Sequence, residues 1–175
     1  SLGLPVMVLV FPPKLAIAIL LPLYLITDFF VAFTWRKFPV LKILKLMVLG
    51  GLIGQILGGL CFEYLDDNYI LTLIGLLALI TSVRYFKNIF FKNNFGYKTK
   101  IILKLSYIRA IGWCGFSGFS SFVALTGGIP AQIFLLPLGL ERQLFVGTMS
   151  FYFLIINLAK LPFFFDLEVF SHTSV

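Results

Sequence analysis

Residues 115–162 read GFSGFSSFVALTGGIPAQIFLLPLGLERQLFVGTMSFYFLIINLAKLP, an apolar stretch interrupted at Thr126-Gly127-Gly128-Ile129-Pro130. A membrane-spanning helix needs about 20 apolar residues in a row. Glycine and proline interrupt such a helix, because glycine loses the most conformational entropy and proline lacks the backbone N–H donor. The stretch therefore predicts a helix that breaks inside the membrane, a short second helix, and then a full membrane-spanning helix.

The composition of the whole chain agrees with a membrane protein. Hydrophobic residues make up 60% of the 175 residues and charged residues only 12%, and the mean hydropathy is +1.04. Soluble domains contain about 25% charged residues, so this chain has too little charge to cover a globule in water. The composition excludes an ordinary soluble enzyme, a disordered chain and a nucleic-acid binder, despite the net charge of +7. We predict an all-α, polytopic transmembrane helical bundle in a lipid bilayer.

The apolar runs predict about five full spans and two half-helices. The half-helices are Leu2–Phe11, which ends at Pro12-Pro13, and Ala131–Leu138. The full spans are Lys14–Trp35, Val40–Leu65, Tyr69–Phe86, Ile108–Leu125 and Gly147–Phe165, with a basic loop at Lys87–Lys104 and a polar tail at Asp166–Val175. In lipid, only helices and closed barrels satisfy the backbone polar groups, and runs of this length are helical.

The positive charges predict an orientation. Eleven of the fourteen Lys and Arg residues fall around two connections on one side of these spans: Arg36, Lys37, Lys42, Lys45, Arg84, Lys87, Lys92, Lys98, Lys100, Lys104 and Arg109. The connection between them, Glu63–Asp67, carries only acidic charges. The positive-inside rule places the basic side in the cytoplasm. We expect the plasma (bacterial inner) membrane, and the charge needs no nucleic-acid partner to explain it.

The break pattern occurs twice. Gly3-Leu4-Pro5-Val6 matches Gly128-Ile129-Pro130-Ala131 at an offset of 125 residues, and after a short insertion the offset is 129, which sets Asp28 opposite Asn157. We predict an N-terminally incomplete first repeat at 1–86, a basic cytoplasmic loop at 87–107, and a C-terminally incomplete second repeat at 108–175. In this topology both repeats run in the same direction, whereas a re-entrant Ala131–Leu138 would invert the second.

Interrupted helices at matching places in two halves are typical of a transporter binding site. A break inside the membrane frees backbone N–H groups at the start of a half-helix, and the helix dipole adds partial positive charge there. Anions can bind such a place without a cationic side chain. The alternative is that glycine and proline merely kink packed helices, which membrane helices tolerate.

Three motifs carry a resemblance to a known family. They are Gly127-Gly128-Ile129-Pro130, Phe145-Val146-Gly147-Thr148 and the Asn157–Pro162 run NLAKLP. With these motifs the chain resembles, over nearly its whole length, the sulfite exporter TauE/SafE family of membrane permeases. The resemblance implies export or uptake of small sulfur-containing or organic anions, such as sulfite, sulfoacetate or related sulfonates. Ile129 departs from the family pattern, which has a second proline there.

The resemblance also bears on the length of the chain, because such permeases have two similar halves. Here the first break lacks its preceding helix, and the second half stops after one full span. We expect a shortened member or the middle of a permease. Two alternatives to a carrier stay open, a passive anion channel on the same scaffold and a non-transporting fragment or subunit.

The candidate substrate-binding residues surround the two breaks. Those of the second half are Ser117, Ser120, Ser121, Thr126, Gly127, Gly128, Pro130 and Gln132, with Thr148 and Asn157 in the following span; those of the first half are Gly3 and Pro5. We expect the backbone N–H groups of Thr126, Gly127, Gly128 and Gln132 to hold the anion, together with the three serines. The alternative for these small residues is close packing of helices.

Asp28 and Lys160 are the charged residues inside the predicted spans that point to coupling. An intramembrane carboxylate is costly, and it is a functional candidate with a partner to be named. Lys160 follows Asn157 by one turn in the matching span, so we expect an ion pair or a proton-coupling acid. An interfacial structural role for Asp28 is the alternative.

Two other features have a functional and a purely structural interpretation. Gly50, Gly54 and Gly58 form a smooth stripe, which predicts close packing within the chain or a homodimer face. Lys14 and Arg142 are predicted at the outer start of each full span, where they reach the interface or attract anions.

The sequence offers no set of residues that would support catalysis or bind a metal or a cofactor. Cys61 and Cys114 lie in apolar segments without a nearby histidine, and the single histidine, His172, lies in the polar tail. A membrane-embedded enzyme would need a cluster of acids, bases or metal ligands, and the spans offer only Asp28 and Lys160. We predict no enzyme activity, no cofactor and no metal.

Overall fold

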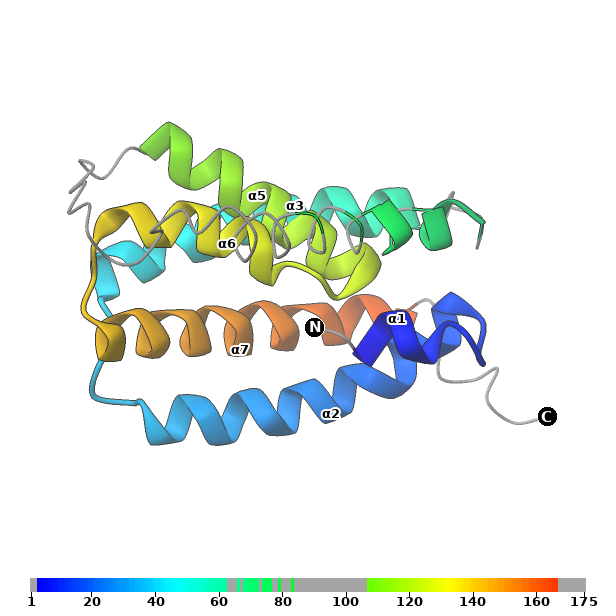
Figure 1. Ribbon diagram of the computed structural model, residues 1–175, viewed down its shortest axis with the longest axis horizontal. Coiled ribbons are helices and arrows are strands. Elements are labelled where there is room, and N and C mark those ends of the chain that lie inside the picture. The colour runs from blue at the N-terminus through cyan, green and yellow to red at the C-terminus, as the bar shows by residue number, and fades with distance from the viewer. Residues whose placement is uncertain are drawn as a thin grey trace.

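The computed structural model describes residues 3–62, 66, 68–72, 74–76, 79, 83 and 107–166. Its elements are α1 (Gly3–Met7), α2 (Pro13–Thr34), α3 (Leu41–Phe62), α5 (Tyr107–Ala124), α6 (Gly128–Leu135), the 3-10 helix η1 (Leu136–Leu138) and α7 (Arg142–Asp166) (Figure 1). The prediction of a polytopic helical bundle is confirmed. The basic loop, half of the predicted span Tyr69–Phe86, most of the acidic connection and residues 167–175 lie outside the described residues.

Three of the described helices are long and apolar enough to cross a membrane, by length and composition. Their apolar spans are Leu15–Thr34, Leu41–Cys61 and Arg142–Pro162. The outer face of α2 exposes large side chains, among them Phe29, Phe30 and Phe33. Exposed aromatic and aliphatic side chains along a whole helix face fit contact with lipid acyl chains.

Helix ends follow local chemistry. Proline stands at the first position of α2, where its missing N–H costs nothing. Gly139 ends η1 in the left-handed region, at φ 64°, which glycine adopts without strain. The last helix, α7, begins at Arg142, five residues before the predicted start at Gly147.

The helices α2 and α7 run in opposite directions (Figure 1). Val40, in the connection from α2 to α3, donates its backbone N–H to Thr148 Oγ1 near the start of α7, at 3.0 Å. Asp28, inside α2, instead contacts Asn157, further along α7. The helix pairs α1–α2 and α6–α7 are therefore inverted relative to each other, and the same-direction topology predicted from the sequence is wrong.

The reason for the inversion lies at the break after α5. After the break, α6 does not continue in the direction of α5. It runs back toward the end of the bundle where α5 begins (Figure 1). Phe134 and Leu135 of α6 pack in one cluster with Ala110 in the first turn of α5 and with Ile43 in the first turn of α3. The segment α5–α6 is a re-entrant pair, which is the alternative that inverts the second half.

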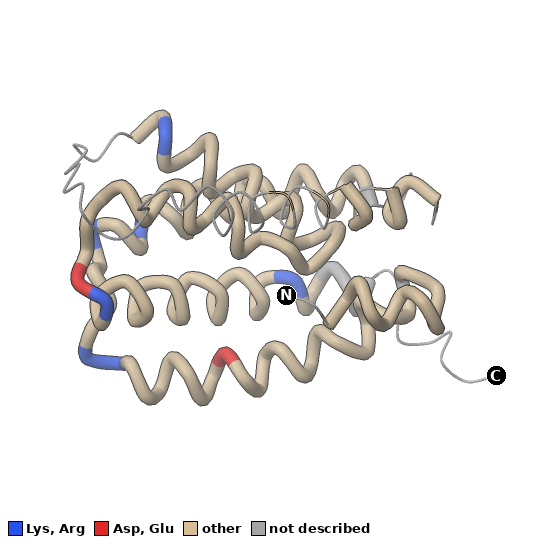
Figure 2. The backbone as a smooth tube through the Cα atoms, in the orientation of Figure 1, with Lys and Arg blue, Asp and Glu red and all other residues tan. Residues whose placement is uncertain are grey.

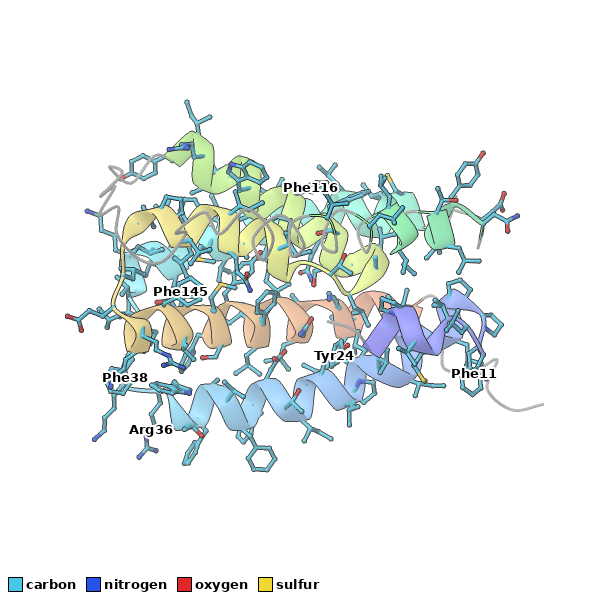
Figure 3. All side chains as sticks on the ribbon, viewed as in Figure 1. Phe11, Tyr24, Arg36, Phe38, Phe116 and Phe145 are labelled. Atoms are coloured by element: carbon cyan, nitrogen blue, oxygen red, sulfur yellow. The ribbon has the colours of Figure 1, made fainter. Side chains whose placement is uncertain are left out.

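Most described Lys and Arg residues gather at one end of the bundle, which we call the basic end (Figure 2). It is the end where α2 connects to α3 and η1 to α7, and it carries the exposed residues Arg36, Lys37, Lys42, Lys45, Arg109 and Arg142. In Figure 3, Arg36 and Phe38 lie at this end, and the Gly147 backbone packs directly on Phe38. Arg142 is thus at the basic end, and its predicted place opposite that end is wrong.

Glycines allow α3 and α5 to pack with their backbones in contact. A Cβ atom at Gly54 would collide with the backbone carbonyl of Gly115, and one at Gly118 with the carbonyl of Gly51. Gly50 and Gly58 face α5 as well. The stripe of Gly50, Gly54 and Gly58 is therefore covered within the chain, as the packing alternative expects. A homodimer stays a prediction that would have to use other residues.

This packing predicts unequal effects of alanine at two glycines. Gly54→Ala inserts a methyl group against the Gly115 backbone, which cannot move aside without separating α3 from α5. Overpacking of this kind costs about 1–3 kcal/mol. We expect a lower midpoint of thermal unfolding in detergent micelles for Gly54→Ala. Gly112→Ala, with no atom within 4 Å of the new methyl group, is the matched control and should unfold at or above the wild-type temperature. Equal midpoints for the two variants would contradict the packing.

Candidate functional site

A cluster of buried polar side chains lies where α2, α5 and α7 meet, beside the break between α5 and α6. Ser117 and Ser121 of α5, Thr126 of the break and Asn157 of α7 are buried, and Lys160 of α7 is 0% exposed. Among the residues whose side chains the structure describes, Lys160 is the one buried Lys or Arg. An intramembrane charge is a functional candidate by default, so this cluster is the candidate site.

The Lys160 ammonium has three oxygen partners. It donates hydrogen bonds to the backbone oxygen of Ser121, to Ser121 Oγ and to Asn157 Oδ1, each at 2.8 Å. An ammonium group has three N–H donors, and this conformation uses all of them. The cluster thus holds a buried cation with neutral acceptors, and joins α7 to the end of α5.

Asn157 connects this cation to a carboxylate on another helix. Its Nδ2 donates to Asp28 Oδ2 at 2.5 Å, while its Oδ1 accepts from Lys160. Asp28 is half-buried on α2, within the apolar span Leu15–Thr34. The predicted partnership of Asp28 and Lys160 is therefore bridged by Asn157, because α2 and α7 cross at the level of Asn157 and Lys160 lies one turn beyond.

Ser117 ties the break to α5. Its hydroxyl donates to the backbone oxygen of Gly127 at 2.6 Å, and the hydroxyl of Tyr152 lies 3.0 Å from the same serine oxygen. Leu125, just before the break, has a φ of 50°. A left-handed conformation is rare for a residue with a bulky side chain and is a form of strain often found at functional sites. The chain turns sharply here within two residues, and Ser117 and Tyr152 hold the turn.

The backbone N–H groups at the break differ in their availability. The N–H of Thr126 donates to the Ser120 oxygen at 3.3 Å, and that of Leu125 to the Ser121 oxygen at 3.1 Å. The Thr126 amide is therefore already used, in contrast to its expected role as an anion donor. Gly127 is buried and Gly128 partly exposed at the start of α6, so the anion role predicted for this pair stays a prediction.

Other candidates lie away from the cluster. Thr148 lies near the basic end, where its hydroxyl donates to the Leu144 oxygen at 2.7 Å and accepts from Val40. Gln132 is exposed on α6. Pro130 is buried in the same helix. Ser120 donates to backbone oxygens of its own helix.

The first break is built differently from the second. Gly3 and Pro5 are partly buried in α1. A Cβ atom at Gly3 would lie 2.9 Å from the Tyr24 hydroxyl, and Figure 3 shows Tyr24 pointing from α2 toward α1. Within the described residues, the first break thus faces Tyr24 of α2, whereas the second is tied to Ser117 of α5.

Two buried residues are part of this region although the sequence did not single them out. Gln55 of α3 is 1% exposed. It donates from Nε2 to the Ile156 oxygen at 2.7 Å, and its Oε1 has no partner among the described residues. Tyr152 is fully buried and holds Ser117. The sequence signals for them are the one amide side chain of α3, one turn after Gly51, and a tyrosine in the middle of a predicted span.

No metal site is found within the described part of the chain, where no three His, Cys, Asp or Glu side chains come together. Cys61 is exposed and Cys114 buried, and both are free. The chemistry that the site offers is thus a cation, one carboxylate, hydroxyls and amides, which bind anions and protons.

The contacts at the break predict a contrast between the two adjacent glycines. A methyl group at Gly127 would lie 2.5 Å from the backbone oxygen of Ser117 and 2.6 Å from Ser121 Cβ. A methyl group at Gly128 would meet only Phe153 Cζ, at 3.9 Å. Gly127→Ala should lower the unfolding midpoint in micelles by the equivalent of about 1–3 kcal/mol. Gly128→Ala should leave it unchanged, and a loss of the same size in both variants would argue against this geometry of the break.

The Asn157 bridge between Asp28 and Lys160 predicts that a second substitution can restore stability lost through the first. Lys160→Met removes the cation and leaves Asp28 without its counter-charge. Breaking a fully buried direct pair costs about 3–5 kcal/mol, and we expect a smaller loss here because Asp28 is half-buried and reaches Lys160 through Asn157. The double variant Asp28→Asn, Lys160→Met removes both charges and should recover most of the loss. Thermal unfolding of both proteins in micelles measures this, and a double variant no more stable than Lys160→Met would refute the coupling of the two residues.

The comparisons with known proteins agree with the composition and the helices. A search of curated proteins found no match, and neither did a search of solved structures. The model of the family described as "Sulfite exporter TauE/SafE" matches residues 1–174. That match covers essentially the whole chain, so it reaches both breaks, the cluster around Lys160 and all the described helices. The chain belongs to the sulfite exporter TauE/SafE family, a family of integral membrane transporters.

Proposed function

We propose that this chain carries small anions, such as sulfite or organic sulfonates, across the plasma membrane as a secondary transporter. The observation that carries the proposal is the buried Lys160 ammonium beside a break in a membrane-embedded helix. The family supports a transporter of sulfite or related anions. The substrate of this particular chain, and its plasma-membrane location, are part of the proposal.

Lys160 supports a binding role better than a structural one. A buried ion pair adds little net stability compared with apolar side chains of the same volume, so packing alone gives no reason to keep a charge there. Its present acceptors are neutral hydroxyl, amide and carbonyl oxygens. An anion oxygen is a stronger acceptor for an ammonium group than these are, so it can replace Ser121 Oγ or Asn157 Oδ1.

The inverted helix pairs support alternating access. In transporters with inverted pairs of broken helices, rocking of one pair against the other exposes a fixed central site to each side in turn. Here the helix pair α1–α2 is inverted relative to the pair α6–α7, and the cluster lies where α2 and α7 cross. By the positive-inside rule, we propose that the basic end faces the cytoplasm.

The direct test is uptake by purified protein in lipid vesicles. We expect labelled sulfite and sulfoacetate to exchange against the same anion trapped inside, and acetate to exchange more slowly. A passive channel on this scaffold would instead pass an ohmic current in a planar bilayer, and a chain that neither exchanges nor conducts any of these anions would refute the proposal.

A matched pair of variants assigns the site. Asp28→Asn, Lys160→Met has no cation in the cluster and should lose exchange of sulfite and sulfonates. Lys37→Met removes a cation that is exposed at the basic end and should keep exchange near the wild-type rate. Equal exchange by the two variants would exclude Lys160 as the binding cation.

A further inference from the structure

The charged groups of the cluster balance one another. Asp28 on α2 and Lys160 on α7 are joined through Asn157, so the pair has no net charge. Tyr24, a phenol on α2, is the other titratable group near Asp28. The elements packed against α2 are α1, whose sequence Gly3–Met7 has no titratable side chain, and α7. The end of α5 and two residues beyond α3 also pack on α2, and they do so with apolar side chains: Phe122, Val123, Ala124, Ile70 and Ile74. Among the described residues, one carboxylate and one ammonium therefore set the charge.

Binding of an anion disturbs this balance. All three N–H donors of Lys160 are in use, so an anion must displace one of the acceptors. Displacing Asn157 Oδ1 separates Lys160 from the bridge to Asp28. The cluster would then hold two negative charges and one positive charge in an interior where an uncompensated charge is very costly. The least costly remedy is neutralisation of Asp28, the one carboxylate of the cluster among the described residues.

We propose that Asp28 takes up a proton whenever an anion binds at Lys160, so that the chain carries one proton together with each monovalent anion. This inference rests on the proposed function and adds the coupling ion and its direction. The proton comes from the solution on the side where the anion enters, converts the carboxylate to a carboxylic acid, and leaves with the anion on the other side. Asn157 transmits the effect, because its amide faces both groups and does not itself titrate.

The balance of charge sets the electrical behaviour. A proton and a monovalent anion that cross together move no net charge, so wild-type transport should follow a pH gradient and ignore the membrane potential. Asn at position 28 cannot take up the proton, so each cycle would carry one negative charge. The variant Asp28→Asn should therefore respond to the membrane potential and not to the pH gradient.

The experiment uses methanesulfonate, which stays a monovalent anion across the neutral pH range, so its own protonation does not vary. Purified protein in vesicles is given an acidic outside, and uptake of the labelled sulfonate is measured. A potassium gradient with an ionophore then imposes a membrane potential without a pH gradient. Glu141→Gln removes an exposed carboxylate at the basic end and is the control, expected to behave as the wild type.

The outcomes separate the coupling from the transport activity. Stimulation of the wild type and Glu141→Gln by the pH gradient, with loss of that stimulation in Asp28→Asn, supports the proposal. Exchange of methanesulfonate by the wild type without response to pH, or an equal response in Asp28→Asn, would overturn the coupling while leaving transport intact. Absence of wild-type exchange with methanesulfonate, sulfite and sulfoacetate alike would instead refute the proposed function.

A measurement on the wild type alone covers the case in which Asp28→Asn does not fold. A pH-sensitive dye trapped in the vesicles reports protons that enter during sulfonate uptake. About one proton for each sulfonate is expected from the charge balance, and uptake without proton entry would overturn the proposal.

Discussion

The hydrogen bonds of the Lys160 ammonium are the interaction on which the arrangement of the helices depends. An unpaired ammonium in a membrane protein interior is very costly, so the surrounding elements have to bring oxygen atoms to it. Ser121 supplies two of these from α5, and Asn157 supplies the third from the preceding turn of α7. Since α5 ends within one turn of Ser121, the same contacts fix where the chain breaks.

The glycine contacts make this arrangement geometrically feasible. Gly54 and Gly118 let the backbones of α3 and α5 touch, and Gly51 of α3 packs on Tyr152 and Ile156 of α7. Both α5 and α7 are therefore held against α3, and Ser121, with its short side chain, contacts Lys160. The same closeness leaves Tyr152 and Gln55 buried beside α3 and α5. Gln55 Oε1 has no hydrogen-bond partner in the described residues, so this close packing leaves its hydrogen-bonding capacity unsatisfied there.

The sequence predicted the helices well and their directions poorly. Apolar runs and Gly-Pro breaks determine where a helix begins and ends, so the bounds of α2, α3 and α5 lie within a few residues of those predicted. The turn after Leu125 depends on φ at one residue and on a hydrogen bond from Ser117 to Gly127, which no periodicity encodes. For the same reason Asp28 was matched with Lys160 by charge, whereas tertiary register places Asn157 between them.

The contact of Asp28 with Asn157 has a particular meaning under the predicted duplication. These two residues occupy matching positions, 129 residues apart, and matching positions of two inverted copies touch only where the axis relating them passes. If the two copies exchanged conformations, this contact would stay in place and Lys160 would move relative to Ser121. The first copy has no equivalent of the Lys160–Ser121 contact, because α2 has no lysine at the position that matches Lys160. With Asp in one copy and Asn in the other, the axis carries a single carboxylate, so there is one proton site for one cation. In the proposed coupling, that asymmetry, rather than the shared break pattern, lets the cluster bind one proton together with one anion.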